Sequence, residues 1–332
     1  MDSELRYHQT TGEWVLIAPK RGKRHNELKK GRTSKRKPSP VNTCPFENPQ
    51  KNGNQVPYFW FPSDKSLKNW RIQVVPNKFP ALKHGHTCTP QKKGGIYLVT
   101  QGVGYHDLVI TRDHFRSFTD LSVREATDVL LAFQKRHREV ALDRCVSYVS
   151  IYCNWGLTAG ATVYHPHYQI IALPVIPASV GRSISFSADY RKKKKRCIHC
   201  DIIAKEKKDR KRIIFENGSV IAFVPFAAKE PFQINIFPKK HLPYFEESSK
   251  ELLKHFAEVL QKILRSVRKR LSDPDYNFFI HTAPVRDKKK HGHYHWHLEL
   301  VPKSNISAGF ELGTGIEINP VFPEEAAKIL RG

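Results

Sequence analysis

Apolar residues recur with a helical period in two long segments of the chain. The first segment follows Ser122-Val123-Arg124-Glu125, and the second follows Ser248-Ser249-Lys250-Glu251. A Ser-x-x-Glu capping box opens each segment, so we predict an amphipathic helix from each start. The apolar faces consist of Val123, Ala126, Val129, Leu130 and Phe133 in the first helix, and Leu252, Leu253, Phe256, Val259, Leu260, Ile263, Leu264 and Val267 in the second.

β-rich runs follow each predicted helix. They cover residues 146–153 and 165–173 after the first helix, and residues 276–282 and 294–301 after the second. Because side chains alternate between the two faces of a strand, His165, His167 and Gln169 share one face of their run. The same alternation aligns His293, His295 and His297.

The order of these signals repeats along the chain. Each half contains a cysteine-led motif, then a single histidine, a capped helix and a His-x-His run. The single histidine precedes the His-x-His run by 51 residues in the first half (His114 to His165) and by 54 residues in the second (His241 to His295). We therefore predict an α+β fold with two tandem halves, residues 1–189 and 190–332, each an antiparallel sheet with one long helix. The seam falls in the basic stretch 190–196.

Composition agrees with a globular chain and sets its class. The 332 residues are 39% hydrophobic and 11% aromatic, which is enough for a substantial core. No apolar run is long enough to span a bilayer, and the N-terminus lacks the profile of a secretory signal. Six cysteines are sparse for a disulfide scaffold. We expect a cytoplasmic protein in a reducing setting, with no membrane partner.

The formal charge of +25 adds one competing hypothesis. Much of the charge lies in runs without interleaved aromatic residues, at 21–36, 191–196, 205–212 and 286–290. Such runs are typical of solvated loops and linkers. They also favour polyanionic partners, so a nucleic-acid-binding protein on the same scaffold stays an alternative, and salt-dependent RNA binding would support it.

The run His165-Pro166-His167-Tyr168-Gln169 carries the candidate chemistry. A glycine-bearing loop, 154–162, precedes it, and backbone N–H groups of such loops bind phosphate oxygens. A neutral imidazole beside that loop can attack an α-phosphorus if a backbone carbonyl holds its other nitrogen. We predict His167 as the nucleophile. Gln169 can form hydrogen bonds without delivering a proton, which favours transfer over hydrolysis.

Two sets of residues have the chemistry of zinc ligands. Cys197, Cys200, His241 and His295 supply two thiolates and two imidazoles, and the Cys-x-x-Cys spacing favours a structural zinc. The alternative is two free thiols beside a basic linker. Cys44, Glu47, His114 and His165 form the first-half equivalent, with Glu47 in place of a thiolate. That set either binds zinc or is a vestigial site held by packing and hydrogen bonds.

The second half contains further histidines in His291-Gly292-His293-Tyr294-His295-Trp296-His297. The repeat assigns His295 to the metal and places His297 where the nucleophile stands in the first half. No glycine-rich loop precedes it. We therefore predict a non-catalytic second half, with His281 and His297 facing a pocket at most.

These motifs together resemble the galactose-1-phosphate uridylyltransferase family of the histidine-triad superfamily, including its ADP-glucose phosphorylase branch. The resemblance covers nearly the whole chain. It rests on Arg21-Gly22-Lys23-Arg24, on 75–82, on 154–169 and on the run 308–320. It implies two histidine-triad-like halves, often paired as a homodimer whose partner completes the site.

The resemblance also implies roles for individual residues. His167 would be the nucleophile, with Gln169 contacting phosphate, and His165 would be a zinc ligand. The residues implied in substrate binding are Arg21, Arg24, Asn77, Asn154, Gly160, Ala161, Thr162, Phe310 and Glu311. The chain departs from the family pattern at Tyr168, where Gly or Ser is usual, which predicts an altered pocket beside the nucleophile. Lys78 replaces a usual acidic residue, and this affects the preference for uridine.

The leading hypothesis is transfer of a nucleoside monophosphate from a nucleotide-sugar to a hexose 1-phosphate, with a covalent nucleotidyl-histidine and ping-pong kinetics. The alternative of the same class is phosphorolysis of an ADP-glucose-like nucleotide-sugar or of a dinucleotide, with phosphate as acceptor. The two differ in which acceptor discharges the labelled enzyme. Nucleobase and sugar stay open.

Overall fold

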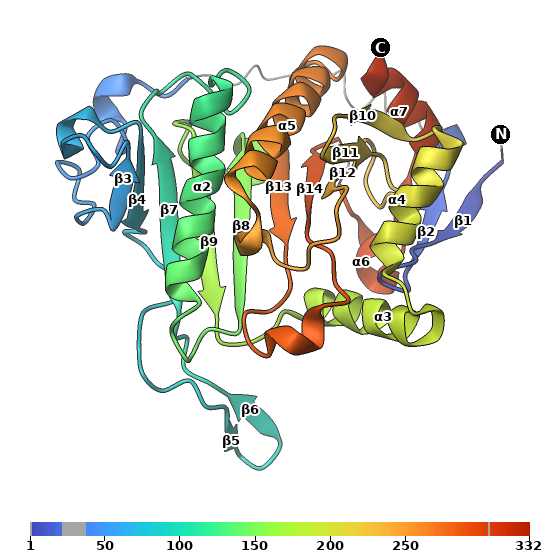
Figure 1. Ribbon diagram of the computed structural model, residues 1–332, viewed down its shortest axis with the longest axis horizontal. Helices are drawn as coiled ribbons and strands as arrows, with labels where there is room; N and C mark the ends of the chain where they lie inside the picture. Colours follow the sequence, from blue (N-terminus) through green and yellow to red (C-terminus); the bar gives the residue numbers. More distant parts are fainter. Residues whose placement is uncertain (1, 22–37, 305) are drawn as a thin grey trace.

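The two long amphipathic segments lie against one face of a single ten-stranded sheet (Figure 1). The computed structural model describes residues 2–21, 38–304 and 306–332. The first segment is helix α2 (Val123–Val140) and the second is helix α5 (Lys250–Arg270). They pack side by side over the sheet, and their apolar faces join one core cluster.

The large sheet is antiparallel throughout and runs across both halves. Its strand order is β10-β11-β12-β14-β13-β8-β9-β7-β4-β3. These strands are β3 (Phe59–Phe61), β4 (Ile72–Pro76), β7 (Tyr105–Thr111), β8 (Tyr148–Trp155), β9 (His167–Leu173), β10 (Ile213–Glu216), β11 (Val220–Phe223), β12 (Ile234–Pro238), β13 (Tyr276–His281) and β14 (His297–Pro302). β8 of the first half pairs with β13 of the second, so the predicted α+β halves are confirmed and their two sheets are fused into one.

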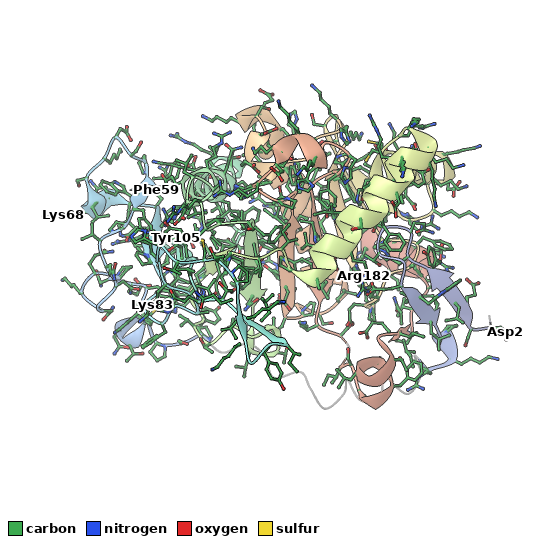
Figure 2. The ribbon with its side chains drawn as sticks, turned by 90° about the horizontal axis from the view of Figure 1, so that it is seen from below. Asp2, Phe59, Lys68, Lys83, Tyr105 and Arg182 are labelled. Atoms are coloured by element: carbon green, nitrogen blue, oxygen red, sulfur yellow. A yellow bond between two sulfur atoms is a disulfide. The ribbon has the colours of Figure 1, made fainter. Side chains whose placement is uncertain are left out.

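Smaller elements surround this sheet. The other strands are β1 (Glu4–Tyr7), β2 (Trp14–Ile17) and β15 (Glu317–Asn319), which form a three-stranded sheet, and the hairpin β5 (Gln91–Lys93) with β6 (Tyr97–Val99). The remaining helices are α3 (Ala178–Lys194), α4 (Ile198–Asp209), α6 (Gly309–Thr314) and α7 (Pro323–Arg331), with short 3-10 helices at Pro19–Arg21, Val41–Thr43, Leu67–Asn69, Leu157–Ala159, Phe245–Glu247 and Lys288–His291. Figure 2, seen from below, shows Asp2 and Lys68 at opposite ends of the molecule.

The N-terminus of α2 forms as predicted, whereas that of α5 begins one residue later. Glu125 N–H donates to Ser122 Oγ at 3.2 Å, and Ser122 N–H donates to Glu125 Oε2 at 2.8 Å. In α5 the cap is Ser249, whose Oγ accepts from Leu252 N–H at 3.1 Å. A capping box needs Glu three residues after the cap. Leu252 holds that position, so the box predicted at Ser248 is wrong.

The seam between the halves is helical. The boundary predicted between residues 189 and 190 lies inside α3, and the basic residues 191–194 form the last turn of that helix. Cations in a last turn are stabilised by the partial negative charge at the helix C-terminus. The predicted domain boundary stays a prediction, but this basic run is not an open linker.

One disulfide departs from the expectation of a reducing setting. Cys88 and Cys145 are joined, and they link the segment before β5 to the turn after α2. Cys44, Cys153, Cys197 and Cys200 are not disulfide-bonded. Among the described residues, no helix is both long and apolar enough to cross a membrane.

His137 of α2 generates a prediction about pH and stability. Its ring is fully buried, and neither ring nitrogen has a hydrogen-bond partner among the described residues. Burial lowers the pKa of His137, although Glu246 opposes this shift, and Lys288 and Arg138 add to it. Below the ordinary histidine pKa of about 6.5, the unfolded chain therefore binds more protons than the folded chain.

We expect the free energy of unfolding to fall as pH drops below about 6.5, with up to about 1.4 kcal/mol per pH unit from this one group. His137→Gln, which does not titrate, should flatten the slope in urea titrations between pH 7 and pH 5. The exposed His86→Gln is the matched control and should keep the slope of the wild type. An unchanged slope in His137→Gln would contradict the prediction.

Candidate active site

His167 stands at the first residue of β9, on the sheet face opposite α2 and α5. Its Nδ1–H donates to the backbone carbonyl of His165 at 2.8 Å, which leaves Nε2 as the nitrogen with a lone pair. The side chain is 9% exposed, and burial lowers the pKa of His167, so the neutral imidazole is the form present near pH 7. A neutral ring with a fixed tautomer is what nucleophilic attack through Nε2 requires.

Gln169 lies two residues further along the same strand face, and its side-chain oxygen is fully engaged. Tyr152 O–H donates to Gln169 Oε1 at 2.9 Å, and His106 Nε2 lies 2.8 Å from the same oxygen. His106 must donate there, because its Nδ1 accepts from the backbone N–H of Ala81 at 3.0 Å. The two N–H groups of Gln169 Nε2 have no partner among the described residues and are left for a ligand.

Asn77 joins this network through His106. Its amide nitrogen lies 3.1 Å from His106 Nε2, while its oxygen accepts from Phe79 N–H at 2.9 Å. Both atoms of the 3.1 Å contact are donors, so the amide nitrogen of Asn77 still lacks an acceptor. Asn77 was expected from the family resemblance, whereas His106 and Tyr152 were not. Both share a sheet face with Gln169 on β7 and β8, but only the pairing of these strands with β9 brings them to it.

Tyr168 does not alter the pocket beside the nucleophile, so that prediction is wrong. Successive residues of a strand point to opposite faces, and Tyr168 therefore enters the core under α2. It is 2% exposed and packs edge-to-face on Phe133 and Phe118, with ring centroids 5.3 and 6.2 Å apart. A large residue at this position therefore fills the core between the sheet and α2, and does not enter the pocket on the opposite face of the sheet.

The loop between β8 and β9 turns through a short 3-10 helix, Leu157–Ala159, flanked by two glycines with positive φ. Gly156 has φ +89°, and a Cβ there would lie 1.8 Å from Asp275 Oδ1. Asp275 holds the loop, because its Oδ2 accepts from Thr158 N–H at 2.8 Å and from Thr158 Oγ1 at 2.7 Å. This carboxylate belongs to the second half of the chain.

The predicted phosphate-binding N–H groups of this loop are only partly available. Gly160 N–H donates to Leu157 O at 3.0 Å, and Ala161 N–H donates to Gly156 O at 3.0 Å, because the tight turn uses both. The N–H of Thr162 and the side-chain nitrogen of Asn154 have no acceptor among the described residues. Continuing the β8–β9 register from Tyr152↔Gln169 by two residues brings Asn154 opposite His167.

The second-half candidate metal ligands come together in one cluster. Their ligand atoms all lie within 4.8 Å of one another, and Cys200 Sγ is 3.5 Å from the Nδ1 atoms of both His241 and His295. The Cys200 thiol, together with the two imidazoles, lowers the pKa of Cys197. Each histidine donates its Nε2–H to a backbone carbonyl, of Gly292 at 2.9 Å and of Pro238 at 3.0 Å. That arrangement aims Nδ1 at the centre of the cluster.

The first-half candidate ligands Cys44, Glu47, His114 and His165 form an equivalent cluster, again within 4.8 Å. Glu47 Oε1 lies 3.1 Å from His114 Nδ1 and 3.4 Å from His165 Nδ1. His114 Nε2 donates to Ser39 O at 2.9 Å, and His165 Nε2 donates to Thr111 O at 2.6 Å.

Buried polar atoms support a metal in this first cluster. Glu47 Oε1 and His114 Nδ1 are buried without a hydrogen-bond partner among the described residues. A buried polar atom without a partner is destabilising, and a cation between these atoms would satisfy both. The residues present therefore fit a four-coordinate zinc ion, with a carboxylate in place of one thiolate.

His297 has the same backbone hydrogen bond as His167, but two further rings stack against it. Its Nδ1–H donates to His295 O at 3.1 Å. Its ring is stacked between Phe237 and His281, with centroids 4.5 and 4.6 Å away. Glu299, at the position equivalent to Gln169, accepts from His281 Nε2 at 3.1 Å. A carboxylate there would repel a phosphate, which agrees with a non-catalytic second half.

A pocket of about 470 Å³ lies over the junction of the two halves, on the sheet face of Tyr152 and Asn154. Lys229 and Lys303 line it, together with residues of β8, β13 and β14. That volume lies in the range of small-molecule sites. The other polar residues that line it are Ser150, Tyr152, Asn154, Glu230, Asn277, Glu299 and Glu317.

Comparison with known proteins decides the family. A model described as galactose-1-phosphate uridyl transferase, N-terminal domain, matches residues 1–177, and a model for a domain of unknown function matches residues 91–330. The chain belongs to the galactose-1-phosphate uridyl transferase family. It is an enzyme of that family, and the resemblance inferred from the sequence motifs is confirmed.

Relatives within the family carry two activities in their names. An ADP-glucose phosphorylase of Arabidopsis thaliana is 34% identical over 99% of this chain and 92% of its own length. A galactose-1-phosphate uridylyltransferase of Thermotoga maritima is 29% identical over 99% of this chain and 98% of its own. The crystal structure of an Arabidopsis thaliana ADP-glucose phosphorylase with bound ADP-glucose superposes with a TM-score of 0.83 at 30% identity, and covers 99% of each chain.

The remaining residues implied by the family lie away from His167. Phe310 and Glu311 belong to α6, which Figure 1 places beyond β14, across β13 and β8 from β9. Phe310 is 47% exposed, whereas Glu311 is buried and accepts from Ala308 N–H at 3.0 Å. Arg21 ends an exposed 3-10 helix after β2. Arg24 lies outside the described residues.

Gly156 yields a prediction about the loop. Gly156→Ala would combine a positive φ with a Cβ inside the Asp275 carboxylate, so we expect a loss of roughly 2 kcal/mol or more in unfolding free energy. Gly181→Ala in α3 is the control. A Cβ there meets only Ile176 Cγ2 at 3.9 Å, and its effect should stay within about 1 kcal/mol. Equal stability of the two variants in thermal unfolding would refute this account of the loop.

Proposed function

We propose that this chain transfers the nucleoside monophosphate of a nucleoside-diphosphate sugar to a phosphate oxygen through a covalent adduct on His167. The observation that carries the proposal is the 2.8 Å hydrogen bond from His167 Nδ1–H to His165 O. It supports a neutral ring whose free Nε2 faces the side of the sheet that carries the unpaired donors of Asn154 and Gln169.

In the first step, Nε2 attacks the α-phosphorus, and the bond from that phosphorus to the bridging oxygen breaks. The electron pair leaves with the sugar 1-phosphate, which needs little acid assistance. The nucleotidylated ring is cationic, and its Nδ1–H stays bonded to the His165 carbonyl, whose partial negative charge stabilises it. The N–H groups of Gln169 and Asn154 donate to the non-bridging oxygens, where charge develops.

In the second step, an oxygen of the acceptor phosphate attacks the α-phosphorus in line. The P–N bond breaks, its electron pair returns to Nε2, and the neutral imidazole is restored. Gln169 holds no transferable proton, so water is not activated at this position. Its amide therefore supports transfer to an anionic acceptor over hydrolysis.

Two acceptors fit this mechanism. Inorganic phosphate would make the enzyme an ADP-glucose-like phosphorylase, and the 34% identity to the Arabidopsis thaliana ADP-glucose phosphorylase favours that candidate. A hexose 1-phosphate would make it a uridylyltransferase of the galactose type, as the Thermotoga maritima relative is named. The sequence-based hypothesis put the hexose 1-phosphate first, whereas we now propose phosphorolysis as the first candidate.

We also propose a homodimer in which the partner completes the site. The separation of α6 from β9 within one chain supports this, as does the exposure of Phe310 at 47% and Leu312 at 78%. A partner's α6 over the His167 face would bury this apolar surface and bring Phe310 and Glu311 toward the sugar.

Zinc in both clusters is the cofactor we propose. It would supply a structural cross-link, because four protein ligands leave no open position for substrate. The first-half ion would fix His165, and through its backbone carbonyl the tautomer of His167. No chemical step involves the metal.

The mechanism predicts a mass increase of one nucleoside monophosphate on the chain during incubation with ADP-glucose or UDP-glucose. His167→Gly should abolish this adduct, and the exposed His86→Ala should keep it. The isolated adduct is then mixed with phosphate or with galactose 1-phosphate, and the acceptor that discharges it identifies the reaction. An adduct on the His167→Gly variant would exclude this mechanism.

Metal content tests the cofactor proposal. With both clusters loaded, elemental analysis should find two zinc ions per chain, because two ligand clusters are present among the described residues. Glu47→Ala and Cys200→Ala should each bring the count to about one, while His86→Ala should leave it at two. A wild-type count of one that Glu47→Ala leaves unchanged would mean that packing and hydrogen bonds alone hold the first cluster.

A further inference from the structure

Asn277 connects the non-catalytic half to the phosphate side of the proposed site. It lies on β13 directly opposite Asn154 on β8, at the junction where the two halves share one sheet. Figure 1 shows these two strands side by side at the centre of the molecule. Asn277 Nδ2 donates to Asn154 Oδ1 at 2.8 Å and to the backbone carbonyl of Ala159 at 2.8 Å.

The direction of these hydrogen bonds is determined by the backbone. The carbonyl of Ala159 can only accept, so Asn277 must present its NH₂ group there rather than its oxygen. The atom of Asn154 that the same NH₂ group contacts must then be an acceptor, Oδ1. The amide nitrogen of Asn154 is therefore turned away from Asn277, and it has no acceptor among the described residues.

The orientation of the Gln169 amide is likewise determined by a backbone group. There a backbone donor, Ala81 N–H, determines the direction of the chain through His106 to Gln169 Oε1. Two amides on neighbouring strands thus have their oxygens occupied by protein donors and their NH₂ groups left over. A pair of amides held in this way presents N–H groups only, which is the polarity that an anionic ligand needs.

We propose that Asn277 is a positioning residue, which holds the amide of Asn154 and the loop 156–162 in the orientation that binds the phosphates of the nucleotide-sugar. The inference rests on the proposed function. It assigns to the second half a role in the reaction that its own histidines do not have. Asp275, two residues before Asn277, holds the same loop through Thr158, so this half contacts the loop at two points.

Removing Asn277 has a specific consequence. Without its NH₂ group, Asn154 can rotate and present its oxygen to the phosphates, and the Ala159 carbonyl loses its donor. Asn277→Asp should be worse than Asn277→Ala. A carboxylate can only accept, so it attracts the NH₂ group of Asn154 and turns the amide oxygen toward the ligand.

A double-mutant cycle in the full-length chain tests this. The rate constant for adduct formation on His167 is measured in single turnovers with saturating ADP-glucose. We expect Asn277→Ala and Asn154→Ala each to slow the step about 10-fold, and the double variant to be within about two-fold of the slower single variant. Asn235→Ala, the same substitution on β12 of the second half, should keep the wild-type rate.

Thermal unfolding and the single-turnover rates together separate the outcomes. Thermal unfolding establishes that each variant is folded. If Asn277→Ala is not folded, Asn277→Asp replaces it in the cycle. Slowing factors that multiply in the double variant, or a rate within two-fold of wild type in Asn277→Ala, would overturn the role of Asn277 while leaving the adduct mechanism intact.

If the unmodified chain forms no adduct with ADP-glucose or UDP-glucose, the proposed function fails instead. The same cycle is then measured on ADP affinity by calorimetry, since the phosphates of ADP would contact the same donors. Coupled losses of affinity would support Asn277 as a positioning residue, and additive losses would reject it.

Discussion

One backbone carbonyl, that of His165, links the candidate metal-ligand cluster to His167, the proposed nucleophile. The side chain of His165 lies in the first cluster, and its Nε2–H is bonded to Thr111 O. Its carbonyl accepts from His167 Nδ1–H. Whatever holds the His165 side chain in place therefore also holds the tautomer of His167. The two histidines can serve these purposes because they are two residues apart, with the carbonyl of the first beside the ring of the second.

The sequence predicted those parts of the fold and site that depend on local periodicity. The capped helix α2, the β-rich runs that follow each long helix and the residues of both candidate metal-ligand clusters follow from spacing and from the repeat. The prediction for Tyr168 was wrong because adjacent residues of a strand face opposite sides of the sheet, so a neighbour of His167 in the motif lies in the core and not in the pocket. His106, Tyr152 and Asn277 could not be singled out, because their roles arise from strands that are distant along the chain and adjacent only in the sheet.

The two halves share one backbone arrangement around a histidine but surround that histidine with different side chains. Both place a histidine at the start of a strand and bond its Nδ1–H to the carbonyl two residues earlier. In the second half, Phe237 and His281 cover the ring, and Glu299 replaces the amide with a charge that opposes phosphate. The rings stacked on His297 and the charge of Glu299, not the backbone, distinguish His297 from His167.

The pairing of β8 with β13 has a consequence for any attempt to divide this chain. Both strands lie in the interior of the ten-stranded sheet, with neighbours on each side. A cut within α3 would turn each into an open edge, with a row of unpaired N–H and C=O groups that favours self-association. The sequence repeat suggests two separable halves, yet each half would have an unpaired strand at the edge of its sheet without the other. The halves are two parts of one folding unit.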